Sequence, residues 1–254
     1  MRILSEMLVL INNAKEAYKR KGIAYVINRA IYYCGMFLEF LYYRTMRMRK
    51  TFVFQGQTYH YFYHWYNKTW KNERAVEVPI ILETVKSSTG RILEVGNVLS
   101  HYFPCQHDIV DKYEKQMRVL NEDVVGFKPS KKYDLIVSIS TLEHVGLDEE
   151  PREPRKILLA IKNLINNCLA PEGKIVITLP IGEKTELDKL LTEGKIPFTR
   201  QYYLKKASKG NQWKEVSHVS EVKYDFPFSG VNAITILTIF SSVSKQLHCH
   251  NSKN

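Results

Sequence analysis

Three carboxylates close three short apolar segments in the middle of the chain. Glu94 follows Arg-Ile-Leu, Asp111 follows His-Asp-Ile-Val, and Asp123 ends Met-Arg-Val-Leu-Asn-Glu-Asp. If these segments are buried parallel strands, their carboxyl ends meet at one edge of a sheet, which is where open α/β sheets bind ligands. A carboxylate at the second end can accept two ribose hydroxyls, and the next can meet an adenine edge. The pattern favours an adenosine site, with helix N-terminal capping as the alternative role of these acids.

A second polar group follows the next apolar segment, KYDLIVSIS, and reads Ser140-Thr141-Leu142-Glu143-His144. Ser140 and Glu143 have the spacing of a capping box, so the start of a helix would use both without any catalysis. Histidine exchanges a proton readily near neutral pH, so His144 could take one from an acceptor hydroxyl. Glu143 and His144 are therefore the candidate catalytic residues, and a satisfied structural histidine is the alternative.

The elements around these residues predict an α/β fold. Five short apolar segments lie between residues 91 and 180, and residues 151–173 show a helical apolar face that Pro171-Glu172-Gly173 ends. Strands alternating with helices imply a doubly wound, mostly parallel sheet. Residues 231–240 predict a late strand beside the fifth segment. Residues 3–43 predict a helix and 52–64 a hairpin, which together form an N-terminal extension, and a helix should follow the hairpin.

Five stretches resemble class I S-adenosylmethionine (SAM) dependent methyltransferases, in particular an uncharacterised prokaryotic group with the same motifs: ILEVGNVLSHYF, IVDKYE, NEDVVGFKP, KYDLIVSISTLEHVG and GKIVITLPIG. The similarity runs from about Phe52 to Phe240. It implies a seven-stranded Rossmann-like sheet with an antiparallel last strand, SAM as cofactor and S-adenosylhomocysteine (SAH) as product. The glycine loop departs from the family's E/D-x-G-x-G-x-G pattern, because Val98 and Ser100 replace two glycines that let the backbone approach the cofactor.

The resemblance also implies roles for single residues. It places Glu94 and Gly96 beside the methionine moiety, Asp111 on the ribose, and Asp123 with Val124 on the adenine. Ser138, with Ser140, would line the pocket at the fourth strand.

Arg74, in the helix upstream of the sheet, is the candidate clamp for the SAM carboxylate, because a guanidinium can bind a carboxylate through two parallel hydrogen bonds. An ordinary pair with Glu77, three residues on, is the alternative.

No metal site is predicted. The Glu143–His144 pair is similar to the small-RNA 2′-O-methyltransferases, which hold a metal through further carboxylate and histidine ligands. Ser140 stands where one such carboxylate would be needed. A second candidate, His248-Cys249-His250 in the C-terminal tail, has no other ligands close in sequence.

Most of the basic charge belongs to the N-terminus. Residues 1–50 hold ten Lys and Arg against three Asp and Glu, so they carry +7 of the formal charge of +11 and leave +4 for the remaining residues. Residues 23–43 are apolar, but Arg29 and Glu39 interrupt them and disfavour a membrane span. The segment predicts an amphipathic helix that lies on an anionic membrane or, alternatively, packs on its own domain.

These patterns divide the chain into a basic helical arm (1–50), a methyltransferase-like domain (51–240, with a core at 90–182 and an acceptor region at 183–230) and a polar tail (241–254). The cysteine spacing gives no disulfide framework, which favours a reducing compartment. The expected location is cytoplasmic, with possible peripheral contact of residues 1–50 at the inner membrane surface.

The expected function is O-methylation of a small-molecule or saccharide-like acceptor by an enzyme that uses SAM. The acceptor region mixes aromatic residues with lysines, which suits a phosphorylated or sugar-bearing acceptor, stacking on single-stranded nucleic acid, or simply a solvated hairpin. A nucleic-acid-directed methyltransferase ranks lower because the domain lacks a long basic stripe. A non-catalytic scaffold with the SAM fold is the remaining alternative, motivated by Val98 and Ser100.

Overall fold

The computed structural model describes residues 2–241, with the side chains of all of these except 2–14 and 17. The chain separates into two compact units, of which the first covers residues 1–48 and the second begins at Arg49. The His248-Cys249-His250 motif lies outside the described residues.

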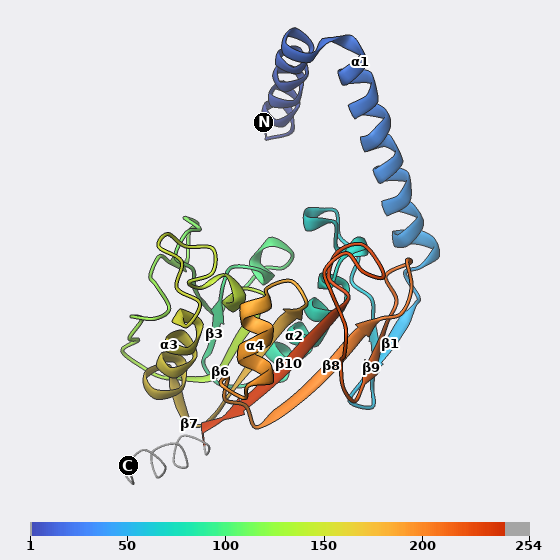
Figure 1. The fold of residues 1–254 in the computed structure, drawn as a ribbon. Coiled ribbons are helices and arrows are strands. Elements are labelled where there is room, and N and C mark those ends of the chain that lie inside the picture. The colour runs from blue at the N-terminus through green and yellow to red at the C-terminus, as the bar shows by residue number, and fades with distance from the viewer. Residues whose placement is uncertain (1, 242–254) are drawn as a thin grey trace. The chain divides into compact units, whose positions relative to one another are not determined.

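The first unit is the helix α1 (Arg2–Met46), which confirms the helix predicted over 3–43 (Figure 1). Its backbone leaves the helical conformation at Gly22, where φ is +77°, so α1 consists of two helical segments. The left-handed region suits glycine because it has no Cβ. Among the described residues, no helix has an apolar stretch long enough to cross a membrane.

The second unit is built on an eight-stranded sheet with the order β5-β4-β3-β6-β7-β10-β8-β9. Strands β5, β4, β3, β6 and β7 are mutually parallel, whereas β10 runs antiparallel to both β7 and β8. The strands of this sheet are β3 (Ile92–Val95), β4 (Asp108–Val110), β5 (Val119–Leu120), β6 (Tyr133–Ile139), β7 (Leu169–Ile181), β8 (Arg200–Lys206), β9 (Trp213–Val216) and β10 (Ala233–Phe240).

This order confirms the doubly wound, mostly parallel sheet and the late strand beside the fifth. The first seven strands across the sheet, from β5 to β8, match the seven-stranded sheet that the resemblance implies. In both, one of the seven strands, here β10, is antiparallel. The eighth, β9, was not predicted. It pairs with β8 from within residues 183–230, so part of that region extends the sheet.

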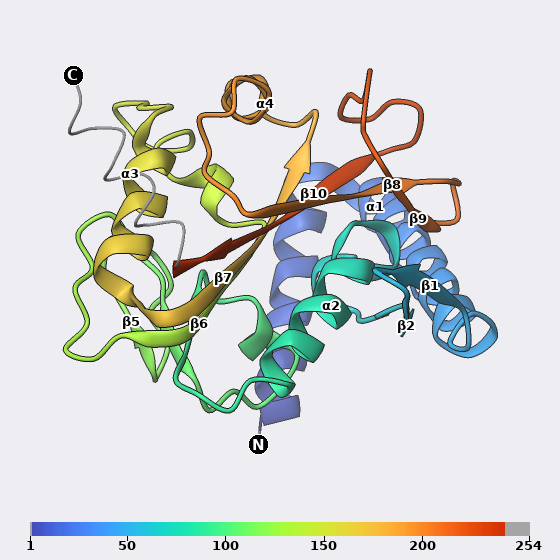
Figure 2. The same cartoon turned by 90° about the horizontal axis from the view of Figure 1, so that it is seen from below.

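Helices cover both faces of the sheet (Figure 2). One face packs on α3 (Lys156–Asn163) and α4 (Thr185–Thr192), and the other packs on α2 (Arg74–Lys86). Strands buried on both faces read as continuous apolar runs, which is why β6 and β7 stand out in the sequence. The predicted helix within 151–173 ends earlier than its turn residues suggest: it passes into a π-helical turn at Leu164–Cys168, and β7 already begins at Leu169.

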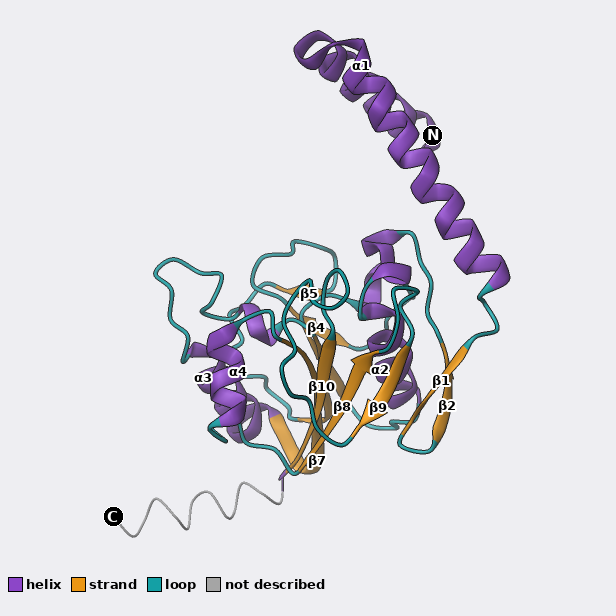
Figure 3. Cartoon of the chain, turned by 45° about the vertical axis from the view of Figure 1, so that its right-hand side comes forward, coloured by secondary structure: helices purple, strands orange, loops and turns teal. Residues whose placement is uncertain are grey.

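The predicted hairpin is confirmed as a separate two-stranded sheet, β1 (Thr51–Phe54) and β2 (Gln57–His60) (Figure 3). Its turn is fixed to the large sheet, because the Gln55 amide donates a 2.8 Å hydrogen bond to the carboxylate of Glu215 on β9. A 3₁₀ turn (Tyr66–Lys71) then leads into α2. The start of α2 therefore lies against the sheet, although α2 precedes β3, the first parallel strand, in the sequence.

Candidate functional site

A cavity of about 330 Å³ lies at the carboxyl ends of β3, β4, β5 and β6, the edge at which the sequence predicts a ligand. Five of the nine predicted site residues line it. The other four, namely Glu94, Ser138, Arg74 and Glu143, do not line it. The residues that line it are Gly96, Asp111, Asp123, Val124 and His144.

The turn after β3 forms around the buried carboxylate of Glu94. Its Oε1 atom accepts hydrogen bonds from the amides of Val98 (2.9 Å) and Leu99 (2.8 Å), and its Oε2 atom lies 2.7 Å from Nε2 of His107. The segment without the two family glycines is thus a compact turn that continues as a 3₁₀ turn at Leu99–His101. The residue placed beside the methionine moiety by resemblance acts here as the internal anchor of the loop.

Gly96 is required by its neighbours. Its φ is +85°, and a Cβ atom at this position would stand 2.3 Å from Oγ1 of Thr141. The Gly96 amide donates to the carbonyl of Val110 on β4 (2.9 Å), so the turn is fastened to the next strand. The one glycine retained from the family pattern is the one that lets the β3 and β6 ends approach each other.

Asp111 is held at the end of β4 by three amides. Its Oδ1 atom accepts hydrogen bonds from the amides of Tyr113 (2.8 Å) and Glu114 (2.9 Å), and its Oδ2 atom accepts one from Asn97 in the glycine turn (3.2 Å). Two carboxylate oxygens offer about four acceptor positions and three are filled, so about one position, on Oδ2, remains for a ligand's hydroxyl. The carboxylate is fixed in direction and still able to bind.

Asp123 belongs to a charged network in the cavity wall. Its Oδ2 atom lies 2.9 Å from Nζ of Lys156 and 3.0 Å from Nζ of Lys112, and both lysines also reach Glu149. Burial acts to raise the pKa of Asp123, but the hydrogen bonds from Lys156, the Val125 amide and Lys112 outweigh it and lower the pKa to about 2. The carboxylate is therefore ionised and already shared between two cations.

His144 stands half exposed at the cavity with a carboxylate on each side. Nδ1 lies 2.5 Å from Oδ2 of Asp148, whose other oxygen accepts a 2.6 Å bond from Nζ of Lys184, and Nε2 lies 3.7 Å from Oε1 of Glu143. The Lys184 and His144 contacts outweigh burial and lower the pKa of Asp148. Burial raises the pKa of Glu143 well above its usual range, although the Arg74 guanidinium opposes this.

Environments that push the pKa values of two carboxyl groups apart in this way are typical of sites that carry out acid–base chemistry. Asp148 stays ionised and orients the imidazole, whereas Glu143 favours its protonated form. The Oε2 atom of Glu143 is buried and has no hydrogen-bond partner among the described residues.

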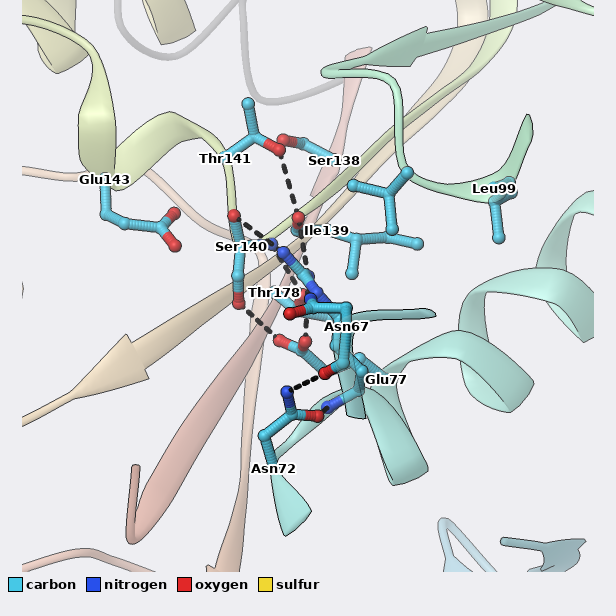
Figure 4. Close-up of polar contacts among 12 residues, drawn as sticks. Asn67, Asn72, Glu77, Leu99, Ser138, Ile139, Ser140, Thr141, Glu143 and Thr178 are labelled. Carbon is cyan, nitrogen blue, oxygen red and sulfur yellow. Dashed lines mark hydrogen bonds and ion pairs between the residues drawn. The ribbon is translucent and has the colours of Figure 1, made fainter. Parts of the chain in front are cut away.

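The capping box proposed for Ser140 and Glu143 is wrong. The 3₁₀ turn Leu142–His144 follows Thr141 and has no side-chain cap, and the Ser140 hydroxyl instead donates to Oε1 of Glu77 at 2.5 Å (Figure 4). Ser140 itself has φ +34°, a conformation that costs free energy in a non-glycine residue and that concentrates at functional sites. The end of β6 is thus a strained turn held by α2.

Arg74 makes the predicted pair with Glu77, with Nη1 3.0 Å from Oε2. The same guanidinium donates to the carbonyls of Ile139 (2.8 Å) and Ser140 (3.1 Å), and its buried Nε has no hydrogen-bond partner among the described residues. Ser138 points to a neighbouring strand, because its hydroxyl donates to the Val95 carbonyl at 3.1 Å. Arg74 therefore lies at the end of β6, and Ser138 joins β6 to β3.

Sequence reasoning missed Asp148, Lys184 and the lysine network. The separation of four residues between His144 and Asp148 was a usable signal, whereas Lys184 and Lys112 come from distant segments that only the fold brings together. It also missed a possible ligand set: Glu94, Cys105 and His107 offer ligand atoms that lie within 4.8 Å of one another. A direct hydrogen bond joins two of these residues, and no metal is assigned to them.

No protein-family model matches the sequence, and no curated protein matches it. Among solved structures, the chain is similar to the N-methyltransferase NodS from Bradyrhizobium japonicum in complex with SAH, at 14% identity over 66% of this chain and 86% of that one, with a TM-score of 0.43. An rRNA methylase from Escherichia coli aligns at 12% identity over 66% and 65% of the two chains (TM-score 0.36). A SAM-dependent methyltransferase from Clostridium acetobutylicum aligns at 11% over 81% and 98% (TM-score 0.35).

The His107–Glu94 contact predicts a dependence of stability on pH. Burial alone would lower the pKa of His107, but hydrogen bonds with Cys105 and Glu94 outweigh it and raise the pKa to about 9 from an ordinary value of 6.5. A raised pKa adds stability that is complete below pH 6.5 and is lost as the pH rises through 9. Urea unfolding of the wild type should therefore show a falling free energy of unfolding across this window.

The variant His107→Gln should be less stable below the window, and its free energy of unfolding should fall less steeply across the window, since it removes one titrating group. The control His60→Gln changes an exposed histidine and should keep the wild-type slope. Parallel curves for the wild type and His107→Gln would contradict the assignment.

Proposed function

We propose that this chain is a SAM-dependent methyltransferase that methylates a hydroxyl of a small-molecule or saccharide-like acceptor. The observation that carries the proposal is one cavity at the carboxyl edge of the sheet that has both a carboxylate fixed by three amides, Asp111, and a histidine oriented by a carboxylate, His144. The first suits a ribose, and the second suits proton transfer from a hydroxyl.

The residues present fit the cofactor. Asp111 has about one acceptor position left for a ribose hydroxyl, and Asp123 with Val124 lines the same cavity just after β5, where the adenine would lie. Arg74 is not proposed as the clamp for the SAM carboxylate, because it does not line the cavity and both of its terminal nitrogens already bind Glu77 or the carbonyls at the end of β6. When bound, SAM supplies a methyl group activated on a sulfonium, so the protein's main tasks are alignment and removal of one proton.

His144 is the proposed general base. The acceptor hydroxyl gives its proton to Nε2, while Asp148 accepts the hydrogen bond from Nδ1–H and stabilises the imidazolium that forms. Glu143, which favours the protonated form, lies near Nε2 without placing a second negative charge there. Lys184 donates a hydrogen bond to Asp148 and holds it in place. Because Lys184 belongs to the proposed acceptor region (183–230), it links that region to the proposed base.

A scaffold without catalysis is the second candidate. The amides of Val98 and Leu99 are occupied by Glu94, so these two donors of the glycine turn are not available to a ligand. This alternative predicts that the protein does not bind SAM or SAH.

Asp111→Ala should weaken SAH binding by roughly 10- to 100-fold, the range expected when charge-assisted hydrogen bonds are lost. Calorimetric titration with SAH measures this effect without knowledge of the acceptor. Asp108→Ala, at the other end of β4, is the matched control and should keep wild-type affinity. Equal affinities for Asp111→Ala and the wild type would remove Asp111 from the ribose role, and an absence of wild-type binding would favour the scaffold.

His144→Gln should lower kcat about 10²–10⁴-fold while SAH affinity and Tm change little, because only proton transfer is removed. The acceptor is first found by screening hydroxyl compounds with methyl-labelled SAM. The control His218→Gln changes an exposed histidine outside the cavity. A His144→Gln protein with lower Tm and full kcat would make His144 structural.

A further inference from the structure

The second segment of α1 has an exposed apolar stripe along one face. Its members recur at intervals of three and four residues, which places them on one side of a helix. Each of them is exposed. They are Ile23, Ile27, Ile31, Cys34, Leu38 and Leu41.

The charged and covered residues of this segment lie on other faces. Arg29 is held away from the stripe by two tyrosines, donating to the hydroxyls of Tyr25 (2.9 Å) and Tyr33 (3.1 Å) one turn before and after it. Met36 and Phe40 are buried, and helical spacing puts both on the side opposite the stripe. The stripe thus lies on a different face of the helix from Met36 and Phe40.

Basic side chains stand at both ends of the stripe. Lys19, Arg20 and Lys21 precede Ile23, and Arg44 and Arg47 follow Leu41. Between these clusters the charges of Arg29 and Glu39 cancel. An apolar helix face flanked by cations complements a surface that is apolar inside and anionic outside.

A second copy of the chain fits this face less well. Because both ends of the stripe are basic, parallel and antiparallel pairing would each bring like charges together. The positions beside a Ile27–Ile31–Cys34–Leu38–Leu41 seam are Asn28, Ala30, Gly35, Phe37, Tyr42 and Arg44, which offer no pair of opposite charges to stabilise a coiled coil.

We propose that the second segment of α1 is a docking surface for an anionic lipid bilayer, on which it lies with its stripe inserted at the headgroup level. The flanking basic clusters bind the lipid phosphates. This role is independent of the proposed methyl transfer and locates the protein at a membrane surface.

The test is co-sedimentation of the full chain with vesicles of phosphatidylcholine and phosphatidylglycerol in equal parts. The two neighbours Ile31 and Tyr32 are a matched pair, since they are 64% and 57% exposed and lie on different faces. Ile31→Glu should weaken partitioning about tenfold, because the isoleucine leaves the apolar phase. Tyr32→Glu introduces the same charge and should stay within about twofold of the wild type. Vesicles of phosphatidylcholine alone should bind the wild type less.

Equal losses for the two variants, or no sedimentation of the wild type, would overturn the proposal. A concentration-dependent dimer that Ile31→Glu dissociates would assign the stripe to a second copy and overturn it as well. If Ile31→Glu lowers the Tm, Leu38→Glu serves as the second stripe variant, with the same expected loss. SAH affinity should be unchanged in every variant, so failure of this proposal and failure of the proposed enzyme are read separately.

Discussion

The buried carboxylate of Glu94 is the contact on which the candidate site depends. Removing a charge from water is costly unless hydrogen bonds replace its hydration, and here two amides of the glycine turn and the imidazole of His107 do so. These bonds draw the segment after β3 into a turn and join it to the residue that precedes β4. The same turn positions the Asn97 amide to donate a hydrogen bond to Asp111. Asp111, directly after β4, is therefore positioned by the turn that follows β3.

The opposite side of the cavity is set by the end of β6. Arg74 and Glu77 on α2 bind the last carbonyls and the Ser140 hydroxyl, which holds Ser140 in its left-handed conformation. Thr141 then packs where Gly96 has no side chain, and the next turn presents His144 to the cavity. The ends of β3 and β6 can thus pack together because Gly96 has no Cβ atom. The proposed cofactor-binding residues and the proposed base both depend on this contact between Gly96 and Thr141.

Much of this arrangement could be predicted from the sequence because it depends on local patterns. The apolar runs predicted the strands. The acids that follow these strands were expected to meet at the carboxyl edge of the sheet, and Asp111 and Asp123 do line the cavity there. The direction in which each side chain points was harder to predict from the sequence. Ser138 bonds the neighbouring strand, because its direction follows from strand register, and Ser140 bonds α2 instead of capping a turn. The lysine partners of Asp123 and Asp148 could not be predicted, since they come from other elements.

The proposal that the Glu94-anchored turn and the end of β4 form the cofactor site can be tested by amide hydrogen exchange with and without saturating SAH. Ligand binding slows the opening of the segments it touches. If SAH binds there, amide exchange should be slower with SAH in residues 95–99 and 111–114, and unchanged in the β1-β2 hairpin (51–60). Exchange that SAH leaves unchanged at both segments, or slows only outside the cavity, would contradict the proposal.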